Sequence, residues 1–315
     1  MAVLRENLVA DVVRAALGPR RIVSVAPLYS GHSGNVWRLV VAGPSEVYVL
    51  RIHRRGATAC AVEAALGQRL RGIVPVPEVV YADPEGETVG APVTLSRWMQ
   101  GQRLEEALTH ANFADALEMG HSVGLTLARI GTVRFDRGGF FSDASLQVRS
   151  ACGTPAQQLI AYAWKRLGRT VRGMPDELRR QYVELVVDEA PGLNRTDGAS
   201  QLVHSDFGPR NLLVTQRYGR WKVAAVLDWE FAFSGSPLVD VASVLRFGED
   251  LPEGYVDGFL TGYREGGGEL SEGWEKLSRL LDVYAMCDLL AADPPGPVTG
   301  RARTIATRSV ARGEI

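Results

Sequence analysis

Residues 202–214, LVHSDFGPRNLLV, place a carboxylate and a carboxamide five positions apart. Asp206 precedes Asn211, and a glycine and a proline lie between them. A second carboxylate, Asp228, follows the apolar run VAAVL, which has the composition of a buried strand. Carboxylate and amide oxygens are hard ligands, which suit Mg²⁺ better than softer metals. These residues therefore predict a magnesium site, provided that the fold brings them together.

The elements around these residues are expected to bring them to one edge. Strand-like segments on either side of QRYGR, residues 216–220, predict a β-hairpin that gathers Asp206, Asn211 and Asp228 at one rim. An aspartate, four intervening residues, an asparagine and a later metal-binding aspartate are also the order of the catalytic parts of protein kinases. This order predicts phosphoryl transfer. Asp206 would meet a substrate hydroxyl, and the other two residues would hold magnesium on nucleotide phosphates.

The N-terminal part is expected to hold the nucleotide. The segments RIVSVAPLYSG, NVWRLVVAG and EVYVLRIHR are typical of consecutive antiparallel strands. The turn YSGHSGNVWRL contains Gly31 and Gly34, whose backbone N–H groups would face phosphate. Arg51 lies on the third strand and Glu63 on the helix that follows, ACAVEAALGQRL. A guanidinium can bind phosphate and carboxylate together, so these two residues are expected to form a pair.

The spacing of apolar residues changes after the first hundred residues. Residues 1–100 read mainly as strands with one main helix, whereas apolar residues recur at helical spacing from about Leu104 onward. We therefore expect an α+β fold. A small antiparallel sheet lobe, residues 1–100, would precede a mostly helical lobe, residues 101–315, with a hinge at residues 95–101.

These motifs resemble those of the aminoglycoside phosphotransferase family, the small-molecule and antibiotic kinases with a protein-kinase-like, two-lobed fold. The resemblance runs from YSGHSGNVWRL through VLRIHRRG, VEAAL and LSRWMQG to LVHSDFGPRNLLV and VLDWEFAFSGSPLVDVAS, and covers most of the chain. It implies that Asp206 is the catalytic aspartate and that Asn211 and Asp228 bind the metal. It also implies that the nucleotide contacts Ser33, Gly34, Arg51, Glu63 and the backbones of Arg97 and Met99.

Two further residues are expected to support the catalytic loop. Asp240, in SPLVD, resembles a family aspartate that buttresses this loop. His204 is interpreted as a packed, hydrogen-bonded residue that braces the loop rather than as a general base. The chain departs from the family at Arg51, where lysine is usual, and at Ser205, where glycine is frequent.

Composition limits the class of protein and its partners. The net charge of -1 favours neither nucleic acid nor an anionic membrane as a partner, and no apolar run is long enough to span a bilayer. The first 18 residues are typical of an amphipathic helix rather than a secretion signal. The three cysteines are far apart and predict neither disulfides nor a metal cluster. We expect a cytoplasmic monomer or homodimer that uses Mg²⁺ with ATP or GTP.

The acceptor is predicted to be a small molecule, with a cationic antibiotic as the first choice. An aminoglycoside or a basic peptide of the capreomycin–viomycin kind would need acidic groups around the cleft, and Glu230, Asp282, Asp288 and Asp293 are the candidates. The last three acids are equally well explained as solvated charges on a tail helix. The alternatives are a metabolite kinase of the choline, homoserine or methylthioribose type, and an inactive nucleotide-binding scaffold.

Overall fold

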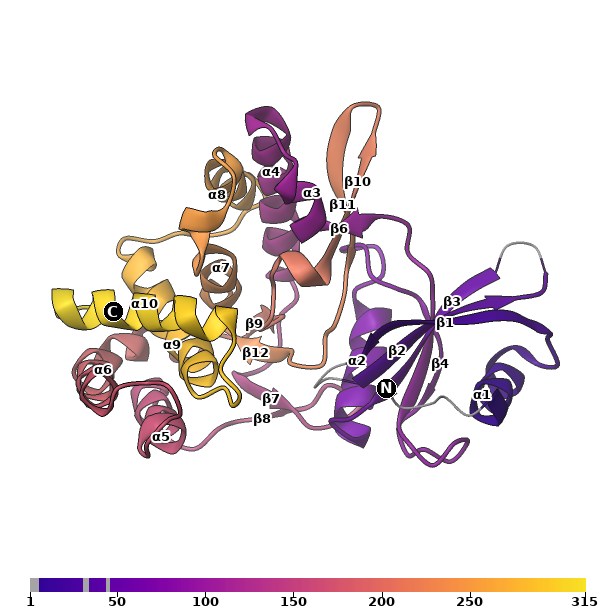
Figure 1. The fold of residues 1–315 in the computed structure, drawn as a ribbon, viewed down its shortest axis with the longest axis horizontal. Helices are drawn as coiled ribbons and strands as arrows, with labels where there is room; N and C mark the ends of the chain where they lie inside the picture. The colour runs from indigo at the N-terminus through magenta and orange to yellow at the C-terminus, as the bar shows by residue number, and fades with distance from the viewer. Residues whose placement is uncertain (1–5, 31–33, 44–45) are drawn as a thin grey trace.

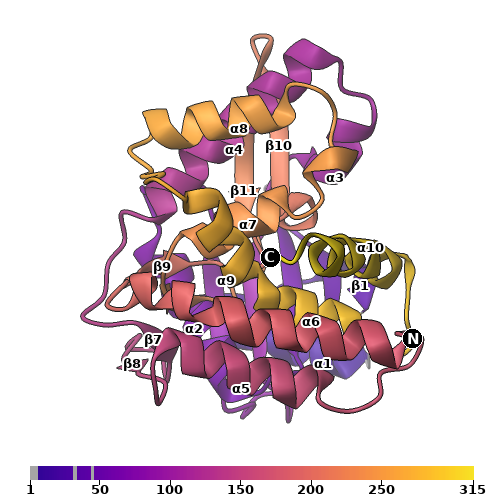
Figure 2. The ribbon, with the colours of Figure 1, turned by 90° about the vertical axis from the view of Figure 1, so that its left-hand side faces the viewer.

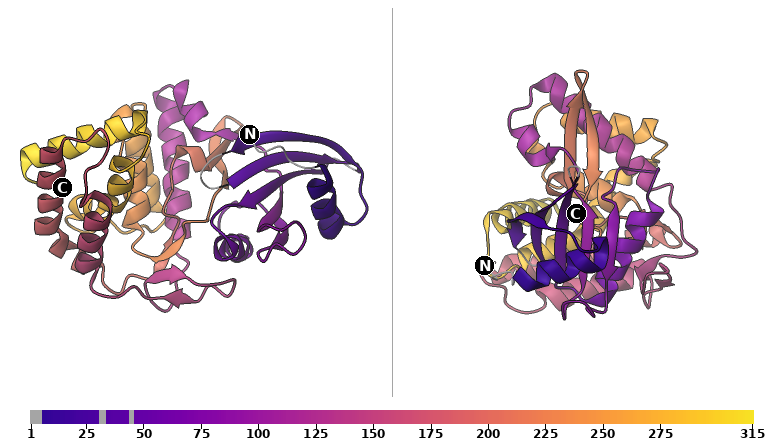
Figure 3. Two further views of the ribbon diagram at one scale, coloured as in Figure 1. Left: turned by 60° about the horizontal axis from the view of Figure 1, so that its bottom comes forward. Right: turned by 90° about the vertical axis from the view of Figure 1, so that its right-hand side faces the viewer.

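The protein folds into two lobes that lie side by side along its long axis (Figure 1). The structure, a computed structural model, describes residues 6–30, 34–43 and 46–315. One lobe is sheet-rich and the other is mostly helical, and Figure 3 shows the same arrangement from two further sides. The predicted α+β class and two-lobed architecture are therefore confirmed. No helix of the described ranges is long and apolar enough to cross a membrane.

The small lobe is a five-stranded antiparallel sheet in the order β1-β2-β3-β5-β4. Its strands are β1 (Ile22–Ser30), β2 (Gly34–Val41), β3 (Glu46–His53), β4 (Val79–Asp83) and β5 (Val93–Arg97), and its helices are α1 (Glu6–Leu17) and α2 (Ala57–Arg69). Buried residues alternate along β2, so one face of the sheet forms a core with α1 in which Leu39, Leu50 and Leu95 are fully buried. β3 pairs with β2 on one side and β5 on the other, which places Arg51 at the centre of the sheet.

Helix α2 shares its core with the large lobe rather than with α1. Its buried residues Val62 and Leu66, with Leu70 just beyond its end, belong to the hydrophobic cluster that fills the helical lobe. The backbone N–H of Val226, in the large lobe, donates to the carbonyl oxygen of Pro75, 2.9 Å away. The helix that carries Glu63 is therefore anchored to both lobes. The predicted boundary between the lobes at residue 100 stays a prediction. The hydrophobic core of the large lobe extends across this boundary and includes residues of α2.

The large lobe packs its helices around one extensive core. Its helices are α3 (Leu104–Thr109), α4 (Phe113–Ile130), α5 (Pro155–Leu167), α6 (Asp176–Glu189), α7 (Leu238–Leu245), α8 (Tyr255–Glu265), α9 (Trp274–Leu290) and α10 (Pro297–Arg312). Short 3₁₀ helices occupy η1 (Ala190–Thr196), η2 (Pro209–Asn211) and η3 (Gly248–Asp250). Helix α5 begins at Pro155, and Pro175 immediately precedes α6, because the missing N–H of proline costs least at the start of a helix.

Two small sheets carry the loops of the site. The predicted hairpin is present: β10 (Leu212–Arg217) pairs with β11 (Arg220–Val226), and β6 (Gln102–Arg103) adds a third strand. A second sheet, in the order β8-β7-β12-β9, joins β7 (Gly139–Phe141), β8 (Val148–Arg149), β9 (Gln201–Val203) and β12 (Phe233–Gly235). At the open end of the hairpin, the N–H of Leu227 donates to the carbonyl of Asn211 at 2.8 Å. Asn211 and Asp228 therefore lie at the same end of the hairpin.

Helices α4 and α8 pack against each other through glycines (Figure 2). Gly120 and Gly124 on α4 face Gly258 and Gly262 on α8, and a Cβ atom at any of the four positions would overlap the backbone of the opposite helix. The absence of side chains lets the two backbones approach closely. This contact fixes α4, and α4 in turn supports β11 through the Ser122 hydroxyl, which accepts the N–H of Val223 at 2.9 Å.

Candidate active site

The loop after β9 is held by a buried carboxylate. Asp240, on the first turn of α7, is fully buried and accepts the backbone N–H groups of His204 and Ser205, each at 2.7 Å. Ser205 has φ 73°, a left-handed conformation that is uncommon for a residue with a side chain. The two bonds to Asp240 hold the backbone in this conformation. Despite these bonds, burial raises the pKa of Asp240 to about 6.

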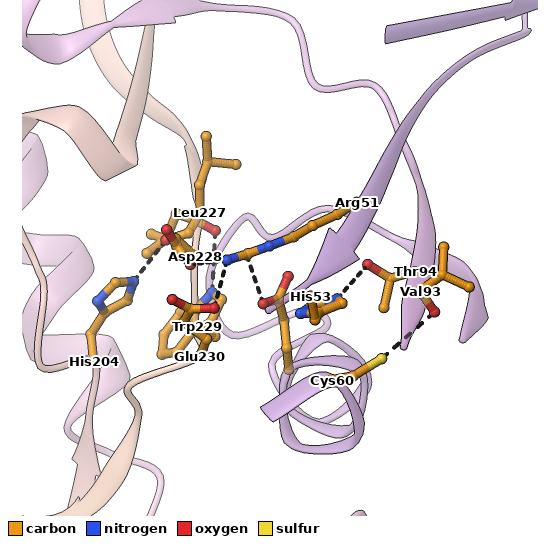
Figure 4. A network of polar contacts seen from close by, with 12 residues as sticks. Arg51, His53, Cys60, Val93, Thr94, His204, Leu227, Asp228, Trp229 and Glu230 are labelled. Atoms are coloured by element: carbon orange, nitrogen blue, oxygen red, sulfur yellow. Dashed lines mark hydrogen bonds and ion pairs between the residues drawn. The ribbon is translucent and has the colours of Figure 1, made fainter. Parts of the chain in front are cut away.

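His204 is a neutral residue that connects two segments of the loop. Its Nε2 donates to the carbonyl of Leu227 at 2.8 Å, and its Nδ1 accepts the N–H of Asp206 at 3.2 Å (Figure 4). A carbonyl only accepts and a backbone N–H only donates, so these partners define the neutral tautomer with its proton on Nε2. The ring is fully buried and packs against Trp229, 4.6 Å between ring centroids. This position suits the bracing role predicted for His204, and leaves its ring nitrogens without capacity to act as a base.

Asp206 and Asn211 are in direct contact. The Nδ2 group of Asn211 donates to the Oδ2 of Asp206 at 2.8 Å and to its backbone carbonyl at 2.9 Å. Burial raises the pKa of Asp206, and the charge of Asp228 acts in the same direction, whereas the bond from Asn211 and the charge of Arg246 oppose both. A carboxylate of raised basicity, fixed by one amide, is suited to accept a proton from a hydroxyl.

Arg51 lies at the centre of a cluster of three carboxylates (Figure 4). Its Nη1 donates to Glu63 on α2, and its Nη2 donates to both Asp228 and Glu230 after β11, each at 2.8 Å. Burial alone would lower the pKa of Arg51, but the three carboxylates outweigh it and raise the pKa well above its usual range. Burial also raises the pKa of Glu63, to about 7, against the opposing effect of Arg51. With all groups ionised, the cluster carries two negative charges more than positive ones, which favours binding of a cation.

The residues present fit a magnesium ion. Asp228 has φ 65°, a strained conformation that is frequent at functional sites, and its side chain is 25% exposed. The bonds of Asn211 to Asp206 use only its Nδ2 group, which leaves the Oδ1 atom as a ligand oxygen. Within the described residues, no three His, Cys, Asp or Glu side chains group closely enough to hold a metal by themselves. One carboxylate and one amide therefore suit an ion that takes its other ligands from phosphate and water, as Mg²⁺ does.

A cleft of about 1350 Å³ between the lobes connects these residues. It is lined by Gly34, Arg51, Glu63, Asp206, Asn211 and Asp228 together with the hinge residues Arg97, Trp98 and Met99. The N–H of Arg97 donates to Glu78 and that of Trp98 to Val47, so these two N–H groups are used within the protein. A Cβ at Gly34 would overlap the carbonyl oxygen of Ile52, so only glycine lets β2 approach β3 here. The predicted contacts of Gly31 and Ser33 lie outside the described residues.

The acids predicted to bind a cationic acceptor are placed differently from the expectation. The side chain of Glu230 is completely buried against Arg51, and that of Asp282 is buried against Arg246, whose Nε and Nη2 groups donate to it at 2.7 to 3.0 Å. Asp288 accepts from Tyr162 and pairs with Arg166, and Asp293 pairs with Arg172. None of the four is among the described residues that line the cleft. An acceptor surface built from these residues stays a prediction, although each of them is paired with an arginine and lies away from the residues that line the cleft.

Other charged residues line the acceptor side of the cleft and were missed from the sequence. The acids are Glu105, Glu106, Glu249 and Asp250, and the arginines are Arg103, Arg210, Arg246 and Arg301. Glu105 pairs with Arg210, Glu249 with Arg308, and Asp250 with Arg301. These residues come from β6 and α3, from η2, η3 and α10, and from the residue after α7, and most of these elements are distant from one another in the sequence. No local pattern marks them, because only the packing of the large lobe brings them to one wall.

The two lobes, the central arginine on β3 and the loop that carries Asp206 define a protein-kinase-like fold with its cleft between the lobes. The model of the phosphotransferase enzyme family, APH, matches residues 24–280, and the chain belongs to this family. No curated protein sequence is similar enough to match the chain.

Solved structures resemble this one over nearly the whole chain. A thermostable mutant of aminoglycoside phosphotransferase APH(4)-Ia, in a ternary complex with AMP-PNP and hygromycin B, is 20% identical over 97% of this chain and 98% of that one, with a TM-score of 0.70. A putative aminoglycoside phosphotransferase from Ralstonia eutropha is 16% identical over 98% of both chains, with a TM-score of 0.70. A putative fructosamine-3-kinase from Thermobifida fusca is 18% identical over 98% of this chain and 100% of that one, with a TM-score of 0.66. At these identities the likeness is one of fold.

Proposed function

We propose that the protein is an ATP- and Mg²⁺-dependent phosphotransferase that acts on a hydroxyl group of a small molecule. The observation that carries this proposal is the meeting of Asp206, Asn211 and Asp228 at one end of the β10–β11 hairpin, opposite Arg51. Phosphoryl transfer needs a group that accepts the hydroxyl proton, oxygen ligands for the metal, and a cation for the phosphates. The cleft contains a candidate for each, and the chain belongs to a phosphotransferase family.

Each of these residues has a distinct part in the proposed reaction. Asp206 accepts or orients the proton of the acceptor hydroxyl, and its contact with Asn211 fixes the direction of its carboxylate. Asn211 and Asp228 hold magnesium, which neutralises charge on the transferred phosphoryl group. Arg51, fixed by Glu63, binds nucleotide phosphate. The backbones of Arg97 and Met99 bind the adenine ring at the hinge.

A cationic antibiotic remains the first proposal for the acceptor, with a revised set of acids. Glu105, Glu249 and Asp250 line the acceptor side, and each is in an ion pair with an arginine whose side chain is 44 to 73% exposed. Exposed ion pairs contribute only about 0–1 kcal/mol, so an amine-rich acceptor can replace the arginines at little cost. Two structural neighbours were crystallised with aminoglycosides, hygromycin B and streptomycin.

A metabolite kinase is the second proposal, and Arg246 favours it. Asp282 holds the Nε and Nη2 edge of this guanidinium, while its Nη1 group has no hydrogen bond among the described residues. Arg246 lines the cleft and lies close enough to Asp206 for their charges to interact. A fixed guanidinium with one open edge is suited to the carboxylate of a hydroxy or amino acid. An acceptor of that kind would place its anion on Arg246 and its hydroxyl near Asp206.

A screen of ATP consumption distinguishes these acceptors. The purified protein with Mg²⁺ and ATP would be tested against aminoglycosides and basic peptide antibiotics, and against small alcohols with and without a carboxylate. Turnover of any of these compounds, with a phosphorylated product in the mass spectrum, supports the kinase proposal. The set of compounds that is phosphorylated identifies the acceptor class. Failure to bind Mg²⁺–ATP would contradict the kinase proposal, whereas binding of Mg²⁺–ATP without turnover of any acceptor would favour the inactive nucleotide-binding scaffold.

The variant Asp206→Asn tests the catalytic role directly. We expect its kcat to fall by at least about a hundredfold, the scale of a positioned acid or base, while nucleotide affinity is retained. Asp257→Asn, at an exposed position on α8, is the control and should react at the wild-type rate. Near wild-type turnover by Asp206→Asn would remove Asp206 from the chemistry.

A further inference from the structure

The guanidinium of Arg51 connects the two lobes of the protein. Arg51 lies on β3 and its partner Glu63 on α2. Its other two partners, Asp228 and Glu230, follow β11 in the large lobe (Figure 4). The Nη1 group donates to Glu63, and the Nη2 group donates to Asp228 and Glu230. A planar guanidinium can hold two carboxylates on different edges in a fixed geometry, which a single ammonium group cannot do. Arginine in place of lysine therefore adds a contact between the lobes.

Glu230 is the most buried member of this cluster. Its side chain is 0% exposed, against 25% for Asp228 and 16% for Glu63. A carboxylate removed from water in this way needs a cation, and its Oε2 lies 2.8 Å from the Nη2 of Arg51. Breaking such a pair leaves a buried charge without compensation and is strongly unfavourable. The arginine and Glu230 thus depend on each other.

The Nη2 group of Arg51 donates to Asp228 and to Glu230 at the same time, but only Asp228 has a second role in the proposed reaction. In the proposed function, on which this inference rests, Asp228 would turn to magnesium, and Glu230 would keep the Nη2 group of Arg51 paired with the large lobe. Glu230 is too deeply buried to reach the acceptor molecule. The pair of carboxylates therefore allows Asp228 to leave Arg51 without separating the lobes.

We propose that Glu230 is a positioning residue that holds Arg51 across the cleft, so that the lobes are aligned before nucleotide binds and Asp228 is available for the metal. The alignment lowers the cost of ordering the cleft when nucleotide enters. Glu230 itself contacts neither nucleotide nor acceptor. Its contribution should therefore appear in the affinity for nucleotide and in the arrangement of the lobes, and much less in the rate at saturation.

A double-mutant cycle with Glu230→Gln and Arg51→Lys tests the proposal. In the wild-type background, Glu230→Gln should raise the Kd for Mg²⁺–ATP, measured by calorimetry, about tenfold or more, because Arg51 loses its buried partner in the large lobe and Asp228 can then turn to the metal only by leaving Arg51 without a carboxylate across the cleft. In the Arg51→Lys background the same substitution should change the Kd less than about threefold, since a lysine cannot hold both edges. Equal effects in the two backgrounds, or an unchanged Kd in the first, would overturn the proposal.

A second readout does not depend on phosphoryl transfer. Small-angle scattering of the nucleotide-free protein should give a larger radius of gyration for Glu230→Gln than for wild type, and saturating Mg²⁺–ATP should remove the difference. Asp83→Asn is the matched control, because Asp83 is a buried carboxylate of the small lobe whose bonds, to the N–H groups of Glu87 and Thr88, stay within that lobe. It should leave the Kd and the radius at wild-type values. Identical scattering of Glu230→Gln and wild type would overturn the proposed alignment.

The same experiments separate this inference from the proposed function. If Asp206→Asn keeps its activity or no acceptor is found, the assignment of the reaction fails, but the Kd and scattering differences still test Glu230. If Glu230→Gln misfolds, the Arg51→Lys/Glu230→Gln double variant carries the test, because it is compared with Arg51→Lys alone. A double variant whose Kd lies within about threefold of the Kd of Arg51→Lys, and whose radius is the same, supports the coupling. A double variant that binds about tenfold worse contradicts it.

Discussion

Asp228 combines a strained backbone with two possible partners, Arg51 and a metal ion. We expect Asp228→Ala to abolish the increase in nucleotide affinity that Mg²⁺ produces, because the variant lacks the carboxylate assigned to the ion. The fold should remain intact, since Glu230 still compensates Arg51. Calorimetry with ATP, in Mg²⁺ and in a chelator, measures the effect. An unchanged Mg²⁺-dependent increment would exclude Asp228 from the metal site.

Asp240 makes a pH-dependent contribution to stability. Its pKa is about 6 in the folded protein, against an ordinary value of 3.8, so the folded state binds the proton more tightly than the unfolded state. This contribution is fully present below pH 3.8 and is lost as the pH rises through 6. The unfolding free energy of wild type relative to Asp240→Asn should therefore fall by up to about 3 kcal/mol between pH 4 and pH 7. Urea unfolding of both proteins across this range gives the difference, and parallel profiles would contradict the shift.

For single residues, the sequence predicted which site residues lie close together better than it predicted what each side chain contacts. The motif around Asp206 and Asn211 is a local spacing, and Arg51 and Glu63 lie on neighbouring elements, so their proximity follows from short-range order. Glu230 was predicted to face the acceptor because it lies two residues after Asp228. Whether it faces the cleft or Arg51 depends on the approach of β3 from the other lobe, and no sequence pattern near Glu230 specifies that contact.

The glycine contact between α4 and α8 determines how closely two elements approach. We expect Gly262→Ala to lower the unfolding free energy by about 2–4 kcal/mol, because its Cβ would overlap the carbonyl oxygen of His121 and push the helices apart. Gly300→Ala, on the exposed face of α10 with open space around it, is the control. This second substitution should raise stability by about 0.5–1 kcal/mol through helix propensity. Chemical denaturation measures both, and similar values for the two variants would show that the helices adjust freely.

Elements with a strong local pattern were predicted, and those that depend on partners were not. The three N-terminal strands, the β10–β11 hairpin and the helices that begin from about Leu104 onward follow from periodicity and turn residues. The sheet of β7, β8, β9 and β12 was missed, because its strands contain only two or three residues and show no alternation. Its strands form only once the loops between them have been brought together. This sheet nevertheless leads directly into the loop that carries Asp206.

At the scale of the whole molecule, the described residues form two hydrophobic cores whose boundary does not follow the predicted hinge. Leu66 on α2 and Leu39 on β2 are both fully buried, but the first belongs to the core of the large lobe and the second to that of the small lobe. Replacing either by alanine should cost about 2–5 kcal/mol. Hydrogen exchange should distinguish them, because Leu66→Ala is expected to increase exchange in both α2 and the large-lobe helices, and Leu39→Ala mainly in the five-stranded sheet. Confinement of both effects to the small lobe would mean that α2 folds with that lobe alone.

Arginine at position 51 also changes how the cleft reacts with covalent reagents. The three lysines of the chain, Lys165, Lys222 and Lys276, are all placed in the large lobe, and none lines the cleft. Reagents that acylate amines require an unprotonated nitrogen, and a guanidinium stays protonated in proteins. A nucleotide analogue that carries an acylating group would therefore find no amine beside its phosphates here. Inhibitors built to capture a phosphate-binding lysine should spare this protein, and a dicarbonyl that condenses with guanidinium groups would be the corresponding reagent.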